Sequence, residues 1–99
     1  MWKLKQSEQF KKDLRKYQND REKMKSLETV LVQLSEKGKV DKRYKPHWLK
    51  GEYSGALECH IENDYLLVWI DEEEKTIKLV RLGSHSELFK WQKWRKGVV

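Results

Sequence analysis

The sequence contains little cysteine, proline or glycine and no long apolar run. Among its 99 residues are one cysteine, one proline and five glycines, which excludes a collagen-like chain and a disulfide-stapled scaffold. Its longest apolar run, Tyr65–Ile70, is far shorter than the roughly 18 residues of a membrane span. No apolar stretch of the signal-peptide kind follows Met1, so a cytoplasmic protein with no membrane partner is predicted.

Charged residues are abundant and their signs are unbalanced. They make up 38% of the chain, and 22 Lys and Arg against 16 Asp and Glu give a formal charge of +6. A small basic domain typically places its excess charge against a polyanion, although a solvated lysine-rich surface explains the same count. Hydrophobic residues are 37%, with five tryptophans, enough for one core. A single domain over residues 1–99 is therefore predicted.

The first third of the chain predicts an edge strand followed by a helical hairpin. Trp2–Lys5 alternates apolar and basic residues, as a protected edge strand does. Two segments with helical spacing follow, marked by Phe10, Leu14 and Tyr17 in the first and by Met24, Leu27, Leu31 and Leu34 in the second. Ser7 and Asp20 are the expected N-caps, and Gly38 is the expected end of the second helix.

After Gly38 the pattern changes to strands. Lys39–Lys50 predicts an irregular basic loop, and three strands are expected at Ala56–Glu62, Tyr65–Ile70 and Thr76–Leu82. Short polar turns between them indicate an antiparallel meander. A Ser-x-x-Glu capping box at residues 84–87 predicts a C-terminal helix. The predicted fold is α+β: a helical hairpin packed on a small, mainly antiparallel sheet, with a short C-terminal helix.

Three histidines are the side chains best suited to chemistry. His47, His60 and His85 all follow the predicted hairpin, and imidazole gives and takes protons near neutral pH. With Asp64 and Arg81 in the same stretch, they match the needs of metal-free RNA cleavage. That reaction uses a base for the 2′-hydroxyl, an acid for the leaving 5′-oxygen and cations for the phosphate. Three unrelated surface histidines would have the same spacing, so the pattern alone does not decide.

No metal or cofactor is expected from the spacing of candidate ligands. The chain has no Cys-x-x-Cys or His-x-x-x-His pair, and adjacent Cys59 and His60 point to opposite faces of a strand. Cys59 is expected in the core. Lys45, beside His47 in the basic loop, is a candidate phosphate contact. In the basic tail, Trp91 and Trp94 fit either base stacking or the core, and the core is expected for Trp91.

Three ordered blocks in the second half of the chain carry a specific pattern: Tyr44–Gly51, Glu58–Trp69 and Leu79–Phe89. At this spacing they resemble the YafQ-like branch of the RelE/ParE toxin superfamily. The resemblance implies a type II toxin that cleaves mRNA, usually on the translating ribosome, and that is neutralised by a cognate antitoxin. The fold of that superfamily, two helices on an antiparallel sheet, agrees with the fold predicted above.

The resemblance also implies the site. Carried over by position, the catalytic residues are His47, His60, Asp64 and His85, and the substrate-binding residues are Arg81, Phe89 and Lys45. His85 is the expected leading proton-transfer group, with Asp64 or His60 as its counterpart and His47 stabilising charge. Arg81 is expected to hold the phosphate and Phe89 to stack on or position a base. Tyr65 stands where relatives carry tryptophan, which leaves the role of that position open. Cleavage would need no metal and would leave a 2′,3′-cyclic phosphate and a 5′-hydroxyl.

A non-catalytic protein of the same fold is the alternative. It would be a gyrase-poisoning toxin or a basic RNA-binding module, and the fold does not separate either from a nuclease. The histidines do, because a pure binder has no need of three together. No motif in the sequence specifies codon preference or the oligomeric state.

Overall fold

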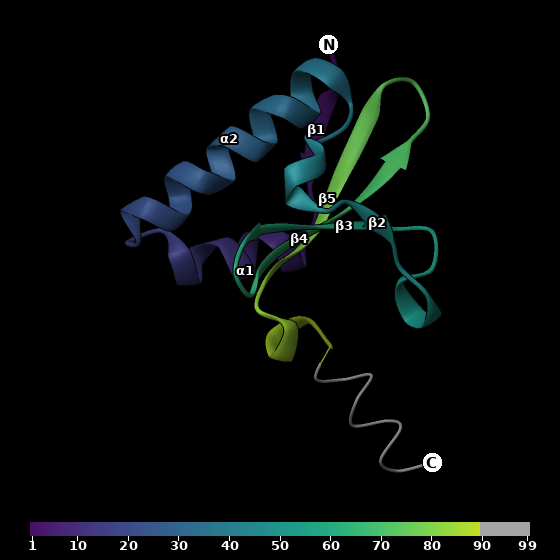
Figure 1. The fold of residues 1–99 in the computed structure, drawn as a ribbon. Helices are drawn as coiled ribbons and strands as arrows, with labels where there is room; N and C mark the ends of the chain where they lie inside the picture. Colours follow the sequence, from purple (N-terminus) through teal and green to yellow (C-terminus); the bar gives the residue numbers. More distant parts are fainter. Residues whose placement is uncertain (90–99) are drawn as a thin grey trace.

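The computed structural model describes residues 1–89, so the expectations for Trp91 and Trp94 lie outside the described residues. The strands and helices are β1 Lys3–Gln6, α1 Glu8–Tyr17, α2 Arg21–Lys37, β2 His47–Trp48, β3 Leu57–Glu62, β4 Tyr65–Glu72 and β5 Thr76–Gly83. Short 3-10 turns, η1 and η2, occupy Lys42–Tyr44 and Gly51–Tyr53. Residues 85–89 are helical and lie at the opposite end of the molecule from the N-terminus (Figure 1).

The predicted helix ends are confirmed. The side chains of Ser7 and Asp20 each accept a backbone hydrogen bond from the first turn of α1 and α2, respectively. Gly38 ends α2 with a φ of 73°. A Cβ at Gly38 would lie 2.5 Å from the Trp2 ring, so both the conformation and the packing require glycine here.

The sheet has five strands in the order β1-β5-β4-β3-β2. The three predicted strands are confirmed as β3, β4 and β5, which pair antiparallel, while β1 adds to β5 in parallel. The prediction for Lys39–Lys50 is wrong in part. His47 and Trp48 form β2 and pair with Glu58 and Leu57 of β3, and a strand of two residues is too short to show an alternating pattern.

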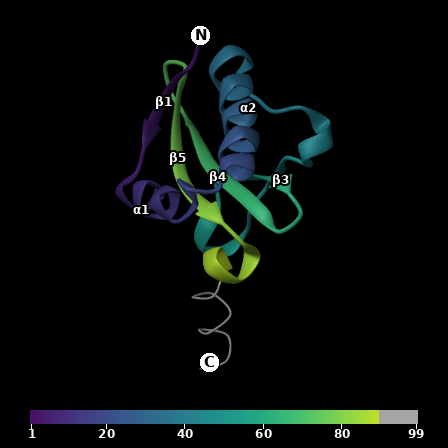
Figure 2. The ribbon, with the colours of Figure 1, turned by 90° about the vertical axis from the view of Figure 1, so that its left-hand side faces the viewer.

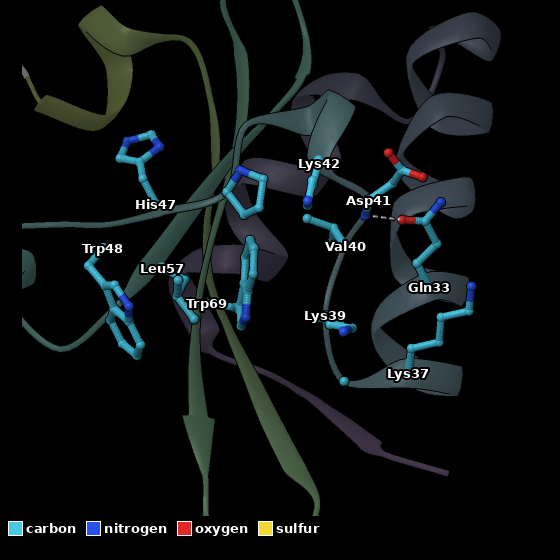
Figure 3. A pocket seen from close by; sticks show the side chains of 12 residues that line it. Gln33, Lys37, Lys39, Val40, Asp41, Lys42, His47, Trp48, Leu57 and Trp69 are labelled. Carbon is cyan, nitrogen blue, oxygen red and sulfur yellow. Dashed lines mark hydrogen bonds between the residues drawn. The ribbon is translucent and has the colours of Figure 1, made fainter.

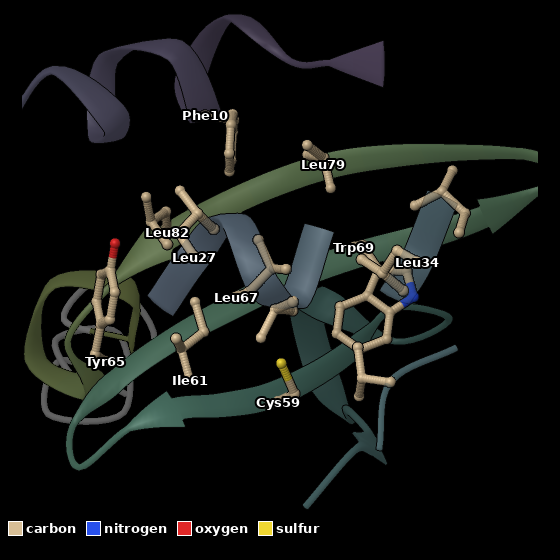
Figure 4. Packing of buried hydrophobic residues seen from close by; sticks show 13 residues of the cluster. Phe10, Leu27, Leu34, Cys59, Ile61, Tyr65, Leu67, Trp69, Leu79 and Leu82 are labelled. Carbon is tan, nitrogen blue, oxygen red and sulfur yellow. The ribbon is translucent and has the colours of Figure 1, made fainter. Parts of the chain in front are cut away.

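The two faces of the sheet have different coverings. On one face, α1 and α2 cover the main core, which includes Phe10, Leu27, Leu34, Cys59, Leu67, Trp69 and Leu79 (Figure 4). Figure 2 shows α2 running along the sheet. On the other face, Leu88 of the helical segment 85–89 packs with Ala56, Leu66 and Val68. Because side chains alternate along a strand, Glu58 and His60 lie on this second face.

Candidate active site

The three imidazoles come together, as expected from the sequence. The ring centroid of His60 lies 5.9 Å from that of His47 and 5.5 Å from that of His85. Pairing of His47 with Glu58 brings β2 alongside β3, and the segment after β5 brings in His85. Residues 38 positions apart in the chain therefore share one side of the sheet. Their convergence is confirmed, while their catalytic roles remain predictions.

Asp64 fixes the orientation of His85. Its Oδ1 accepts a hydrogen bond of 2.8 Å from the backbone N–H of His85 and another of 2.8 Å from His85 Nδ1. Asp64 can reach both because it occupies the turn between β3 and β4 with a φ of 53°. The backbone bond first, and then the side-chain bond, lowers the pKa of Asp64. An ionised Asp64 requires a proton on His85 Nδ1, which leaves Nε2 for exchange with a substrate.

Glu58 is a site residue to which the sequence assigned no role. Its side chain is 3% exposed, with Oε1 3.0 Å from His47 Nε2 and 4.0 Å from His60 Nε2. Its other oxygen, Oε2, is buried and has no hydrogen-bond partner among residues 1–89. Glu58 lies on the polar side of β3, but its burial depends on β2, which the sequence pattern did not reveal.

The two ring nitrogens of His47 both face acceptors. Nδ1 lies 2.9 Å from the carbonyl oxygen of Lys45, and Nε2 faces the Glu58 carboxylate. A carbonyl only accepts, so Nδ1 carries a hydrogen. The two contacts fix the orientation of the His47 ring at the edge of the site.

His60 lies between the other two histidines. Burial lowers its pKa most, and the Glu58 carboxylate acts in the opposite direction. The charges of His85, His47 and Lys45 also lower the pKa of His60. The Lys45 side chain is exposed at the end of η1, and Lys45 lines a shallow pocket together with His60.

Arg81 is held by α1 as well as by the sheet. Its Nε donates to Asp13 Oδ2 at 2.8 Å and its Nη2 to Oδ1 at 3.4 Å, and Nη1 donates to the Tyr53 hydroxyl at 3.2 Å. Asp13 is buried and also accepts from the Leu82 N–H at 2.9 Å. The arginine side chain is still 19% exposed. Sequence patterning placed Asp13 in a helix and gave no sign of this pair.

Phe89 borders the histidines as expected, whereas Tyr65 does not. The Phe89 ring centroid lies 6.2 Å from that of His85 and 5.7 Å from that of Tyr53, edge to face. Tyr65 is buried in the main core on the helix-covered face, against Tyr17. It therefore cannot meet a substrate held by the histidines.

A pocket of about 660 Å³ lies between the end of α2 and β2 (Figure 3). Lys37, Lys39 and Lys42 line it together with Trp48 and Trp69. His47 also lines this pocket, so the pocket adjoins the edge of the histidine cluster at β2.

Comparisons with known proteins define the family. Residues 2–90 match the family model described as a bacterial toxin of a type II toxin–antitoxin system, YafQ. The mRNA interferase toxin YafQ of Escherichia coli K12 is 31% identical over 86 residues, which cover 84% of this chain and 90% of that protein. A metal-bound toxin from Helicobacter pylori is 39% identical with a TM-score of 0.78, covering 90% of this chain and all of that one. YafQ in the E. coli DinJ–YafQ complex is 29% identical with a TM-score of 0.67, over 90% and 99% of the two chains.

The fold and the histidine cluster together define the class of protein: a small bacterial toxin with two helices on one face of a mixed sheet. The chain belongs to the YafQ family of type II toxins. The name mRNA interferase, carried by the E. coli relatives, is that of an endoribonuclease. In the described residues no helix has the length and apolarity that crossing a membrane requires.

Proposed function

We propose that this chain is an mRNA interferase that cleaves RNA by metal-independent acid–base catalysis. The observation that carries the proposal is the geometry of His85: Asp64 orients its ring, and the ring of His60 lies 5.5 Å away. Two imidazoles at this distance can flank one phosphodiester. Because Asp64 is already bonded to His85, His60 is the better counterpart in proton transfer.

The proposed reaction needs no group outside the chain and the RNA. His60, as a neutral imidazole, takes the proton of the 2′-hydroxyl, and the 2′-oxygen attacks the adjacent phosphorus. His85, whose ring is oriented by the Asp64 carboxylate, gives a proton from Nε2 to the departing 5′-oxygen. The products are a 2′,3′-cyclic phosphate and a 5′-hydroxyl.

The remaining site residues bind the charged phosphate and a nucleotide base of the RNA. His47, held in place by the Lys45 carbonyl and the Glu58 carboxylate, acts together with the Lys45 ammonium to stabilise negative charge on the phosphate. Arg81, although paired with Asp13, keeps N–H groups on Nη1 and Nη2 for a phosphate oxygen. Phe89 offers a ring face next to His85 for a base. We further propose that the substrate is mRNA on the ribosome and that an acidic antitoxin neutralises the +6 chain.

Expression of the His85→Ala variant tests this function. The variant should no longer arrest growth or generate new 5′-hydroxyl ends in cellular transcripts, yet it should still bind the cognate antitoxin. Glu73→Ala, in the exposed turn before β5, is a control that should stay fully toxic. A toxic His85→Ala variant would favour the alternative, a non-catalytic binder such as a gyrase poison. Inhibition by EDTA, with ribosomes kept intact, would contradict metal independence.

A further inference from the structure

The pocket between the end of α2 and β2 has an aromatic wall that ends in an exposed tryptophan. Trp48 pairs with Leu57, and Leu57 pairs with Trp69, so the three side chains form a row across β2, β3 and β4 on one face of the sheet. All three line the pocket (Figure 3). Trp69 is buried at the inner end of this row, whereas Trp48, at the edge, is 65% exposed. Trp48 is the only exposed tryptophan, tyrosine or phenylalanine in residues 1–89, and its ring is available for stacking.

The same pocket carries unpaired positive charge. Three exposed lysines, Lys37, Lys39 and Lys42, line it, and none of them forms an ion pair within residues 1–89. Asp41, the acidic residue of the lining, already accepts a hydrogen bond from the Arg43 N–H. A ring face beside surplus positive charge is the combination that holds single-stranded nucleic acid.

His47 connects this pocket to the other histidines. It lines the pocket, and its ring centroid lies 5.9 Å from that of His60. His60 is followed by His85 at 5.5 Å, and His85 by Phe89 at 6.2 Å. The pocket therefore lies at one end of a row of rings and Phe89 at the other. Because β2 is the edge strand of the sheet, an RNA strand can pass from the histidines into the pocket without crossing another strand.

The proton transfers proposed above give this row a direction. His60 takes the proton of the 2′-hydroxyl, which belongs to the nucleotide on the 5′ side of the scissile phosphate. His85 protonates the 5′-oxygen, which belongs to the nucleotide on the 3′ side. The 5′ part of the RNA therefore lies toward His47 and the pocket, and the 3′ part lies toward Phe89.

We propose that the pocket binds one nucleotide of the RNA on the 5′ side of the scissile phosphate. Its base stacks on Trp48, and the three lysines hold the backbone phosphates. The lysines alone would also suit an acidic peptide, but the continuity of the pocket with the histidines favours RNA. This proposal rests on the proposed function, because the roles of His60 and His85 set the direction of the strand. Stacking tolerates every base, so the pocket contributes affinity and register and does not select one base.

Cleavage of a short RNA with a single cut position tests this subsite. The intact RNA is compared with two forms that lack the first or the second base on the 5′ side of the cut, and with one that lacks the first base on the 3′ side. Trp48→Ala should lower kcat/KM on the intact RNA about tenfold and cause no further loss on one of the RNAs that lack a 5′ base. On the RNA that lacks the 3′ base, the tenfold loss should remain.

Two further variants control for folding and for exposed apolar surface. Trp48→Phe keeps an aromatic ring and should recover most of the activity. Val32→Ala removes an exposed apolar side chain of α2 that does not line the pocket, and it should behave as the wild type. A loss from Trp48→Ala that is equal on all four RNAs, or no loss at all, would overturn the subsite. A Trp48→Ala variant that is impaired only in binding the cognate antitoxin would overturn it too, and would assign the pocket to a protein partner.

Failure of the proposed function gives a different result. A wild-type chain that cleaves no RNA contradicts that function, and the pocket is then judged by binding of single-stranded RNA to chains that carry His85→Ala. In this background Trp48→Ala should weaken the affinity about tenfold and Val32→Ala should not change it. Equal affinities would overturn the pocket as an RNA site.

Discussion

The three histidines have different hydrogen-bond partners, and these partners leave different ring nitrogens free to react. His85 presents one nitrogen to Asp64 and leaves the other for a substrate. His47 has acceptors at both nitrogens, which fix the orientation of its ring. The His60 ring makes no hydrogen bond within residues 1–89, and its nearest carboxylate oxygen, on Glu58, is 4.0 Å away. Of the three, His60 is the ring most available to accept a proton.

The role of Asp64 is testable by Asp64→Asn. Asparagine keeps an oxygen that can accept from the His85 backbone, but it removes the negative charge beside His85 Nδ1. The rate of RNA cleavage at neutral pH should fall about 10- to 100-fold, as measured by single-turnover cleavage of a defined RNA. The melting temperature should not change, because the Asp64 side chain is exposed. Full activity of Asp64→Asn would remove Asp64 from the mechanism.

At the residue scale, sequence reasoning found the side chains whose chemistry is unusual and missed the one whose environment is unusual. His47, His60 and His85 were visible as the only imidazoles in the chain. Glu58 was one of many glutamates, and its significance comes from burial between β2 and β4. A residue type is visible in a sequence, whereas burial depends on strands that pair only in three dimensions.

The helix α1 and the strand β5 are joined by the buried pair of Asp13 and Arg81. Removing Asp13 leaves the Arg81 guanidinium and the Leu82 N–H without their shared acceptor. Asp13→Ala should therefore lower the free energy of unfolding by about 3 kcal/mol, measured by urea denaturation. The double variant with Arg81→Ala should lose much less than the sum of the two single variants. An additive result would show that the pair contributes nothing as a pair.

A second link ties α1 to the start of the C-terminal helical segment. The Tyr17 hydroxyl donates to Glu87 Oε1 at 2.6 Å. This bond, followed by that from the Ser84 N–H, lowers the pKa of Glu87 below its ordinary 4.5. A lowered folded-state pKa means that the stabilisation is fully present above the unfolded value and is lost as the pH falls through the folded value.

The Tyr17→Phe variant tests the contribution of the hydrogen bond between Tyr17 and Glu87. At pH 7 it should lower stability by about 1 kcal/mol, and the difference between wild type and variant should shrink as the pH falls below about 4. Thermal unfolding at several pH values measures this. A difference that stays constant down to pH 2 would mean that Glu87 ionisation is not involved.

Elements long enough to show a period were predictable, and the shortest strand was not. The caps Ser7, Asp20 and Gly38 and the strands from β3 to β5 follow from local rules of spacing and capping. β2 is two residues long and is defined only by its pairing with β3. It carries His47, so an element that no pattern could reveal completes the site.

At the scale of the whole molecule, one face of the sheet holds most of the core and the other face holds the candidate active site. The helix-covered face carries most of the core, and the other face carries the histidines beside a smaller cluster around Leu88. The site therefore faces the surroundings on a chain with a formal charge of +6. Under the proposed function, affinity for RNA depends on electrostatic attraction and cleavage depends on the histidines, so the two should respond to different changes.

The salt dependence of RNA binding tests whether affinity comes from electrostatic attraction, independently of cleavage. Binding of a catalytically inactive His85→Ala chain to single-stranded RNA should weaken steeply with salt, because each phosphate contact releases counterions with a slope of about −0.7 in log K against log salt. Lys45→Ala, made in this background, should reduce the steepness of the slope by about one such contact. Lys11→Ala, on α1 and paired with Glu8, is a matched control and should leave the slope unchanged. Equal slopes for all three chains, measured by filter binding, would mean that Lys45 does not contact phosphate, and a flat slope would contradict a polyanionic substrate altogether.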